Sequence, residues 1–224
     1  MTVPACRYQI QLALDLTDID RALWVCQETA ENIDILEAGT PLIKATGIAA
    51  VRRIRHAFPQ KQLVADMKTI DTGALDAAMA FDAGADGVIV QATAPHQTVK
   101  AVVEESRRRG KMCMVDSLGI NDMIRFERIV SPSGADYGVV HTGIDEQRDG
   151  YRPLERLRRV VSGGMIKRIA VAGGIGPEMI PEILSVLPRG IVIVGASITQ
   201  SSEPASVARA IRQLLTATEL SGVG

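Results

Sequence analysis

The sequence predicts an α/β protein in which eight parallel strands form a (β/α)8 TIM barrel with the helices outside. Eight short apolar stretches rich in β-branched residues alternate with segments of helical periodicity. These stretches are apolar at nearly every position, as expected for a parallel sheet buried on both faces. An open, doubly wound sheet also fits the alternation. The strand count favours the barrel, although 224 residues is slightly below its typical length.

The elements follow one another without an obvious linker. Strands are expected, in chain order, at residues 8–14, 33–36, 62–65, 87–90, 111–115, 137–140, 169–172 and 191–194. Helices are expected at residues 19–30, 47–58, 73–83, 98–109, 122–129, 154–161, 177–186 and 204–215. No low-complexity tract divides the chain, so residues 1–224 are predicted to form a single domain.

Composition excludes several classes of protein. The hydrophobic fraction is 46% and the net charge is −1, which gives no general reason to expect nucleic acid as a partner. No apolar stretch is long enough to cross a membrane, and the first residues lack the pattern of a secretory signal. We therefore expect a cytoplasmic protein. Cys6, Cys26 and Cys113 share no metal-ligand spacing and are expected to be reduced thiols, two of them in the core.

Polar residues gather where the predicted strands end. In TIM barrels the carboxyl ends of the strands carry the active site. The strand ends carry, in order, Asp15, Glu37, Asp66 with Lys68, Gln91, Asp116, His141, Gly173 with Gly174, and Gly195. Because side chains alternate along a strand, Asp66 and Lys68 share a face, and Asp71 follows in the next loop. A salt bridge with a helix cap would explain an isolated cluster of this kind, but not a whole ring of strand ends.

The last two strand ends predict a phosphate site. Gly173 and Gly174 follow the seventh strand, and Gly195 and Ala196 follow the eighth. Small residues let backbone N–H groups approach an anion, and the loops after strands seven and eight recurrently bind phosphate in these barrels. Glycines that only make tight turns are the alternative. The expected ligand is a phosphorylated small molecule.

The charge balance predicts a divalent metal ion. Glu37, Asp66 and Asp71 outnumber Lys68, and buried charge of one sign is costly unless it is paired or coordinated. Mg²⁺ suits one or two carboxylates together with substrate oxygens and waters. The absence of a Cys or multiple-His cluster argues against zinc.

Six segments together resemble the orotidine monophosphate decarboxylase superfamily, in order along nearly the whole chain. They are LALD at residues 12–15, EAGTPLIK at 37–44, VADMKTID at 64–71, HTGIDEQ at 141–147, VAGGI at 171–175 and VGASI at 194–198. Within the superfamily they resemble the branch that holds 3-hexulose-6-phosphate synthase and 3-keto-L-gulonate-6-phosphate decarboxylase.

Four positions separate the two activities of this branch. The resemblance to the decarboxylases would imply Glu at Asp116, Arg at Ile144, Thr at Ala172 and a phosphate-binding Arg at Ala196, and this chain has the synthase type at each. An Arg at Ile144 would bind a substrate carboxylate, so its absence favours a substrate without one. Decarboxylation or epimerisation of another keto-sugar phosphate, and binding without catalysis, remain alternatives.

The resemblance implies a mechanism and residue roles. Glu37 and Asp66 would bind Mg²⁺, which would stabilise the enediolate of ribulose 5-phosphate. His141 would transfer the C1 proton, and the enediolate would attack formaldehyde to give D-arabino-3-hexulose 6-phosphate, a reversible reaction. Lys68 would hold the carboxylates, and Asp15 and Asp116 would orient substrate hydroxyls.

The resemblance also implies a homodimer with shared active sites, because Asp71 of this family reaches into the partner subunit's site. One departure from the family is Thr46, which stands where many relatives carry an acidic residue. Arg125, Arg148 and Arg152 could also bind an anion differently from the family pattern.

Overall fold

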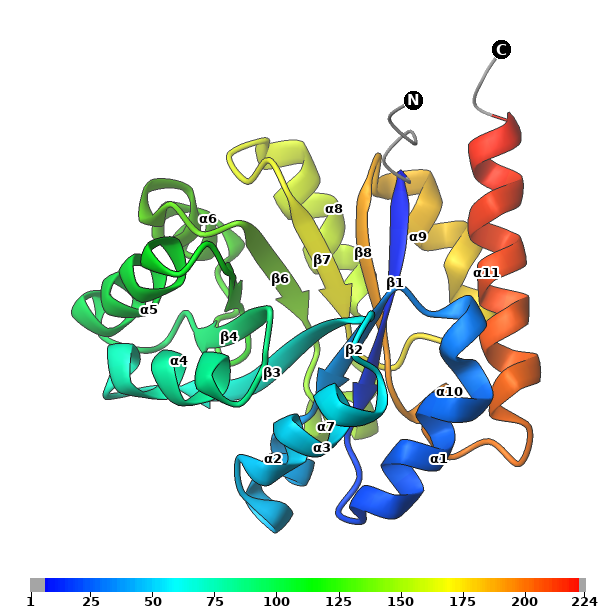
Figure 1. Cartoon of the computed structure of the whole chain (residues 1–224). Helices are drawn as coiled ribbons and strands as arrows, with labels where there is room; N and C mark the ends of the chain where they lie inside the picture. The colour runs from blue at the N-terminus through cyan, green and yellow to red at the C-terminus, as the bar shows by residue number, and fades with distance from the viewer. Residues whose placement is uncertain (1–6, 222–224) are drawn as a thin grey trace, which may run out of the picture.

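The computed structural model describes residues 7–221, and its eight strands form the predicted closed parallel barrel with neighbours in chain order (Figure 1). The strands are β1 (Tyr8–Leu14), β2 (Ile35–Ala38), β3 (Gln62–Thr69), β4 (Gly87–Gln91), β5 (Met112–Asp116), β6 (Tyr137–His141), β7 (Ile169–Ala172) and β8 (Gly190–Val194). β8 pairs with β1, which closes the barrel. β2 begins at Ile35 rather than at Ile33, and β3 continues past the predicted Ala65 to Thr69.

The eight predicted helical segments are present, but three further short helices were not predicted. The helices are α1 (Ile19–Thr29), α2 (Thr40–Thr46), α3 (Ala49–Ala57), α4 (Gly73–Asp82), α5 (His96–Arg108), α6 (Met123–Ser133), α7 (Ile144–Arg148), α8 (Pro153–Gly163), α9 (Ile180–Val186), α10 (Ala196–Thr199) and α11 (Pro204–Ser221), with 3₁₀ turns η1 (Ala30–Asn32) and η2 (Pro177–Met179). The unpredicted helices α2, α7 and α10 begin soon after the ends of β2, β6 and β8. α2 and α7 lie at the end of the barrel toward which the strand arrows point (Figure 1).

The α-helices predicted at 47–58 and 177–186 begin later in the structure, at Ala49 and Ile180. Residue 47 is not helical, because Gly47 has φ of 67° and separates α2 from α3, which begins at Ala49. The segment predicted at 177–186 is divided into η2 and α9. Asp18 and Asp122 act as N-caps for α1 and α6, each accepting two backbone N–H groups of the first turn.

The strands separate two hydrophobic cores. The larger core lies between the strands and the surrounding helices, and includes Leu12, Leu36 and Val90 of the strands with Val25 and Ile54 of the helices. The smaller core fills the barrel interior and consists of Ala13, Ile35, Val64, Ile89, Met114, Val139, Ala170, Ala172, Ile191 and Ile193. Inward side chains therefore fill the barrel, as expected for this fold.

The interior core directly positions the polar strand ends. A step of two residues along a strand returns to the same face. Two residues beyond the interior residues Ala13, Ile35, Val64, Ile89, Met114, Val139 and Ile193 stand Asp15, Glu37, Asp66, Gln91, Asp116, His141 and Gly195. The polar residues thus form the layer that covers the barrel interior at the carboxyl ends of the strands.

Cys26 and Cys113 are buried free thiols, as predicted for two of the three cysteines, and burial raises the pKa of each to about 12. Cys6 lies outside the described residues. Among the helices of residues 7–221, none is both long enough and apolar enough to span a membrane.

Candidate active site

A cavity of about 440 Å³ opens at the carboxyl ends of the strands and gathers most of the predicted site residues. It is lined by Asp15, Glu37, Asp66, Lys68, Asp116, His141, Gly173, Gly174, Gly195 and Ala196, together with Ala13, Thr40, Pro41, Lys44, Ile89, Leu118, Val139, Gly143, Ile144, Gln147, Ala172 and Ile193. A cavity of about 610 Å³ lies at the opposite end of the barrel. Two of the charged residues lining it, Asp86 and Lys111, are paired at 2.8 Å, and none of the predicted site residues lies there.

Glu37 and Asp66 form a buried carboxylate pair on neighbouring strands. The Gln11 side-chain amide donates to Glu37 Oε2 at 2.5 Å, and the Thr40 hydroxyl donates to Asp66 Oδ2 at 2.9 Å. Burial, followed by the charges of Asp66 and Asp15, raises the pKa of Glu37 well above its ordinary value. The other oxygen of Asp66, Oδ1, is buried and has no hydrogen-bond partner among residues 7–221.

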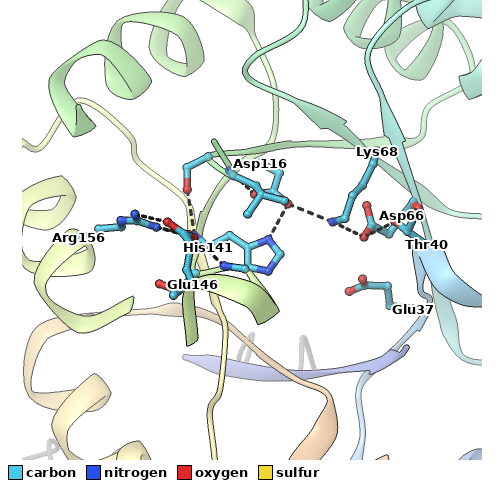
Figure 2. Close-up of polar contacts among 12 residues, drawn as sticks. Glu37, Thr40, Asp66, Lys68, Asp116, His141, Glu146 and Arg156 are labelled. Atoms are coloured by element: carbon cyan, nitrogen blue, oxygen red, sulfur yellow. Dashed lines mark hydrogen bonds and ion pairs between the residues drawn. The ribbon is translucent and has the colours of Figure 1, made fainter. Parts of the chain in front are cut away.

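Lys68, which lines the cavity, joins the carboxylates of Asp66 and Asp116 (Figure 2). Its Nζ lies 2.8 Å from Asp66 Oδ2 and 3.6 Å from Asp116 Oδ2. Burial alone would lower the pKa of Lys68, but Asp66 and Asp116 raise it above its ordinary value, so the lysine is a cation. Its φ of 43° is unusual for a residue with a side chain, and it coincides with a register shift between β3 and β4.

His141 and Asp116 form a hydrogen-bonded pair across β5 and β6. His141 Nδ1 lies 2.8 Å from Asp116 Oδ2, and Asp116 Oδ1 accepts the Leu118 N–H. Burial alone would raise the pKa of Asp116, but His141 and Lys68 hold it below its ordinary value. Asp116 is therefore an ionised acceptor, which places the proton on Nδ1 of His141 and leaves Nε2 as the free ring nitrogen.

The same pairing affects the basicity of His141. Burial alone would lower the pKa of His141, but the charge and hydrogen bond of Asp116 raise it above its ordinary value. Because both oxygens of Asp116 are engaged by protein groups, its observed contacts orient the imidazole. The predicted role of Asp116 toward substrate hydroxyls stays a prediction.

The loops after β7 and β8 lie side by side at the cavity. Gly173 and Gly174 have φ of 114° and 65°, a region that residues with a side chain rarely adopt. A Cβ on Gly174 would lie 2.9 Å from Gln147 Oε1. The Ser197 hydroxyl donates to the Ile175 carbonyl at 2.8 Å and thereby connects the two loops. These small residues leave backbone accessible from the cavity, which suits an anion.

Asp15 and Asp71 are placed differently from the central residues. Asp15 lines the cavity beside Gly195 and remains exposed, and its pKa is raised by partial desolvation and by the charge of Asp66. Asp71 lies outside this cavity and is exposed, and its carboxylate accepts the N–H of Thr72 at 2.7 Å. Its predicted role in a site shared with a partner subunit stays a prediction.

The donor set fits a hard divalent cation with few protein ligands. Glu37 and Asp66 both face the cavity, and Asp66 Oδ1 lacks a partner there. Within residues 7–221, no three or more His, Cys, Asp or Glu side chains converge as a metal site. Two carboxylates suit Mg²⁺, which commonly retains water and substrate oxygens, and they fit poorly to zinc, which prefers more protein ligands.

The sequence interpretation missed several polar partners of these residues. Alternation along β1 places Gln11 on the inward face of the strand, and this signal could have identified it as a partner of Glu37. The contact of Thr40 with Asp66, in contrast, depends on the position of α2. Arg156 of α8, which contacts the His141 carbonyl, carried no sequence signal.

Thr46, named above as a departure from the family, ends α2 and donates to the Leu42 carbonyl. Arg125, Arg148 and Arg152 do not line the cavity.

Comparison with known proteins gives consistent matches over nearly the whole chain. The family model described as "Orotidine 5′-phosphate decarboxylase / HUMPS family" matches residues 8–211. The 3-hexulose-6-phosphate synthase of Bacillus subtilis (strain 168) is 35% identical over 207 residues, covering 92% of this chain and 98% of that protein.

Solved structures agree with these sequence matches. The crystal structure of 3-hexulose-6-phosphate synthase from Salmonella typhimurium has a TM-score of 0.89 at 34% identity, over 93% of this chain and 99% of the other. The 3-keto-L-gulonate-6-phosphate decarboxylase of Vibrio cholerae has a TM-score of 0.81 at 30% identity, over 93% and 97%.

Proposed function

This chain is an enzyme of the orotidine 5′-phosphate decarboxylase / HUMPS family, and we propose that it condenses formaldehyde with D-ribulose 5-phosphate to D-arabino-3-hexulose 6-phosphate and catalyses the reverse cleavage. Relatives named 3-hexulose-6-phosphate synthase support this reaction, since they align over most of both chains. The preference for condensation over decarboxylation rests on the apolar rim of the cavity. Ile144 and Ala172 line the cavity, and among residues 7–221 no arginine does so. A substrate carboxylate would lack its usual bidentate partner there.

The proposed reaction assigns a task to each side of the cavity. The β7 and β8 loops, with Gly173, Gly174, Gly195 and Ala196, bind the substrate phosphate through backbone N–H groups. His141 Nε2 removes the C1 proton of ribulose 5-phosphate, and Asp116 holds the imidazole and stabilises its charge. The resulting enediolate carbon attacks formaldehyde, whose oxygen takes the proton back from the His141 imidazolium and becomes the new hydroxyl. Asp15 orients the substrate hydroxyls, and Lys68 binds the substrate oxygens that become negative.

Magnesium completes this proposal. Glu37 and Asp66 hold the ion, as supported by the unpartnered Asp66 Oδ1 and by the raised pKa of Glu37. When bound, the cation stabilises negative charge that develops on the vicinal oxygens of the substrate. The carboxylate of Glu37 otherwise accepts from the neutral Gln11 amide, its one hydrogen-bond partner in the described part of the chain.

A homodimer with shared sites is the assembly we propose. Asp71 projects from a surface that also exposes Ile70, Leu75 and Met79, with exposed fractions of 51%, 59% and 42%. These apolar side chains belong to the β3–α4 turn and α4, next to Asp71. Such a patch suits a second copy of the same chain, which would receive Asp71 in its own cavity.

The test is an assay of purified enzyme with ribulose 5-phosphate, formaldehyde and Mg²⁺, beside a parallel assay of carbon dioxide release from 3-keto-L-gulonate 6-phosphate. We expect formaldehyde consumption and formation of the hexulose phosphate at the greater kcat/KM. Faster decarboxylation than condensation would transfer the assignment to a decarboxylase. Binding of ribulose 5-phosphate without turnover in either assay would indicate a non-catalytic sugar-phosphate protein.

A further inference from the structure

Arg156 of α8 connects three segments around the end of β6. Its guanidinium donates to the His141 carbonyl at 3.0 Å, to Asn121 Oδ1 at 2.9 Å and to both carboxylate oxygens of Glu146 at 3.2 and 2.6 Å. Figure 2 shows Arg156 and Glu146 on the side of His141 opposite Lys68. Asn121 belongs to the β5–α6 loop and Glu146 to α7. One side chain thus joins the loops that follow two neighbouring strands.

Glu146 transmits this contact to the turn before α7. Its Oε2 atom also accepts the N–H of Gly143 at 2.9 Å, so the carboxylate caps the start of the helix. Hydrogen bonds from Arg156 hold the pKa of Glu146 below its ordinary value. The Arg156 and Glu146 side chains are 15% and 31% exposed, in contrast with a freely solvated surface pair.

Helix α7 depends on such contacts for its position. It contains only five residues, and an isolated helix of that length is not stable. Yet Gly143, Ile144 and Gln147 of this segment line the cavity, and Ile144 is 52% exposed at its rim. The backbone of His141 is held from both sides, by Ser117 Oγ on its N–H and by Arg156 on its carbonyl.

We infer that Arg156 and Glu146 form a latch that positions the segment 141–147 for turnover, with Arg156 as a positioning residue that does not touch the substrate. The latch resists displacement of His141 relative to Asp116 and of Ile144 relative to the cavity. Misplacement of a reacting group by about 1 Å can lower a rate by roughly 100-fold. The kinetic part of this inference rests on the proposed condensation reaction.

Kinetics of Arg156→Met test the latch, because Met preserves the aliphatic packing and removes the guanidinium. We expect kcat to fall by roughly 10- to 100-fold, with KM for ribulose 5-phosphate changing by less than about three-fold. Arg156→Lys should recover part of kcat. Arg159→Met is the matched control: Arg159 lies on the same helix and pairs with Glu155 at 2.6 Å, with both side chains mostly exposed. The control should retain kcat within about two-fold.

A double-mutant cycle separates a latch from two independent effects. Glu146→Gln alone should lower kcat, and the double variant Arg156→Met/Glu146→Gln should be no slower than Arg156→Met within about two-fold. All variants are compared well below their unfolding midpoints, measured by circular dichroism. Wild-type kcat in Arg156→Met, an equal loss in Arg159→Met, or multiplied losses in the double variant would overturn the inference.

Amide hydrogen exchange provides a readout that does not need the proposed reaction. Residues 142–150 should exchange faster in Arg156→Met than in the wild type, while Arg159→Met should leave them unchanged. If the wild-type enzyme shows no condensation, the proposed function fails, and this exchange experiment still decides whether the latch exists. Unchanged exchange in Arg156→Met would refute the latch even if condensation is observed.

Discussion

Charge compensation differs among the acidic residues of the cavity. Asp116 contacts His141 and lies 3.6 Å from Lys68, and Asp66 contacts the same lysine at 2.8 Å. Glu37 instead accepts a hydrogen bond from the neutral amide of Gln11 and lies in the field of two other carboxylates. Glu37 is therefore the residue whose ionisation costs most in the absence of a cation.

Replacing Asp66 with Asn should lower turnover by several orders of magnitude without unfolding the barrel. The change removes a charged ligand from the proposed Mg²⁺ site and one of the two carboxylates that hold Lys68. Steady-state kinetics with Mg²⁺ provide the measurement. Asp82→Asn, at an exposed ion pair with Arg109, is the control and should be fully active. Full wild-type activity after exhaustive chelation would rule out the metal.

The raised pKa of Glu37 predicts a pH dependence of stability. The folded state keeps the proton of Glu37 at pH values where the unfolded chain has lost it. The contribution of Glu37 to the free energy of unfolding therefore decreases as pH rises from about 4.5 toward the raised pKa of the folded state. In chelator, the unfolding temperature of the wild type should fall with pH more steeply than that of Glu37→Gln. Mg²⁺ should stabilise the wild type more at neutral than at acidic pH.

Thermal unfolding across this range, with chelator or with Mg²⁺, provides the comparison. The difference in unfolding temperature between wild type and Glu37→Gln reports the contribution of Glu37, because Asp15 and His141 titrate in both proteins. Parallel pH profiles of the two proteins would contradict the assignment of the shift to Glu37.

At the scale of elements, strands and short helices were not equally predictable. The strand ends follow from alternation, because the residue two positions beyond an interior residue lies on the same face of its strand. Helices α2, α7 and α10 contain only seven, five and four residues, which is too short for a periodic signal. These helices nevertheless supply Thr40, Ile144 and Ala196 to the cavity.

Residues of helix α7 and strand β7 are predicted to set the specificity for condensation over decarboxylation. Ile144→Arg combined with Ala172→Thr introduces a cation and a hydroxyl where the cavity has an apolar rim. We expect the double variant to release carbon dioxide from 3-keto-L-gulonate 6-phosphate faster than the wild type, and to fix formaldehyde more slowly. Both rates are measured on the same preparations. A variant that loses condensation without gaining decarboxylation would show that this rim does not set the choice.

At the scale of the whole molecule, Asp71 and the neighbouring apolar patch predict complementation between subunits. Asp71→Ala and Asp66→Ala chains should each be inactive, because each lacks one part of a shared site. Random mixing places about half of the dimers in mixed form, and one of the two sites in each would be intact. Activity should recover to about a quarter of the wild-type sites. Confirmed subunit exchange without recovery would show that Asp71 does not complete the partner's site.

The sequence by itself determined the barrel and the ring of polar residues at its carboxyl end. Strand period and strand count are local properties, and closure of a parallel barrel brings all the carboxyl ends together. These two rules place Glu37, Asp66, Asp116 and His141 in one layer without knowledge of their contacts.

Only the tertiary structure decided which partner each of these residues takes. The hydrogen bonds from Gln11 to Glu37, from Thr40 to Asp66 and from His141 to Asp116 join different segments of the chain. The left-handed backbone of Lys68 coincides with the register shift between β3 and β4, which is a property of the paired strands. The alternation of side chains along a strand specifies the face on which each side chain lies, but it specifies neither the rotamer nor the neighbours of that side chain. Such contacts therefore arise only when packing brings distant segments together.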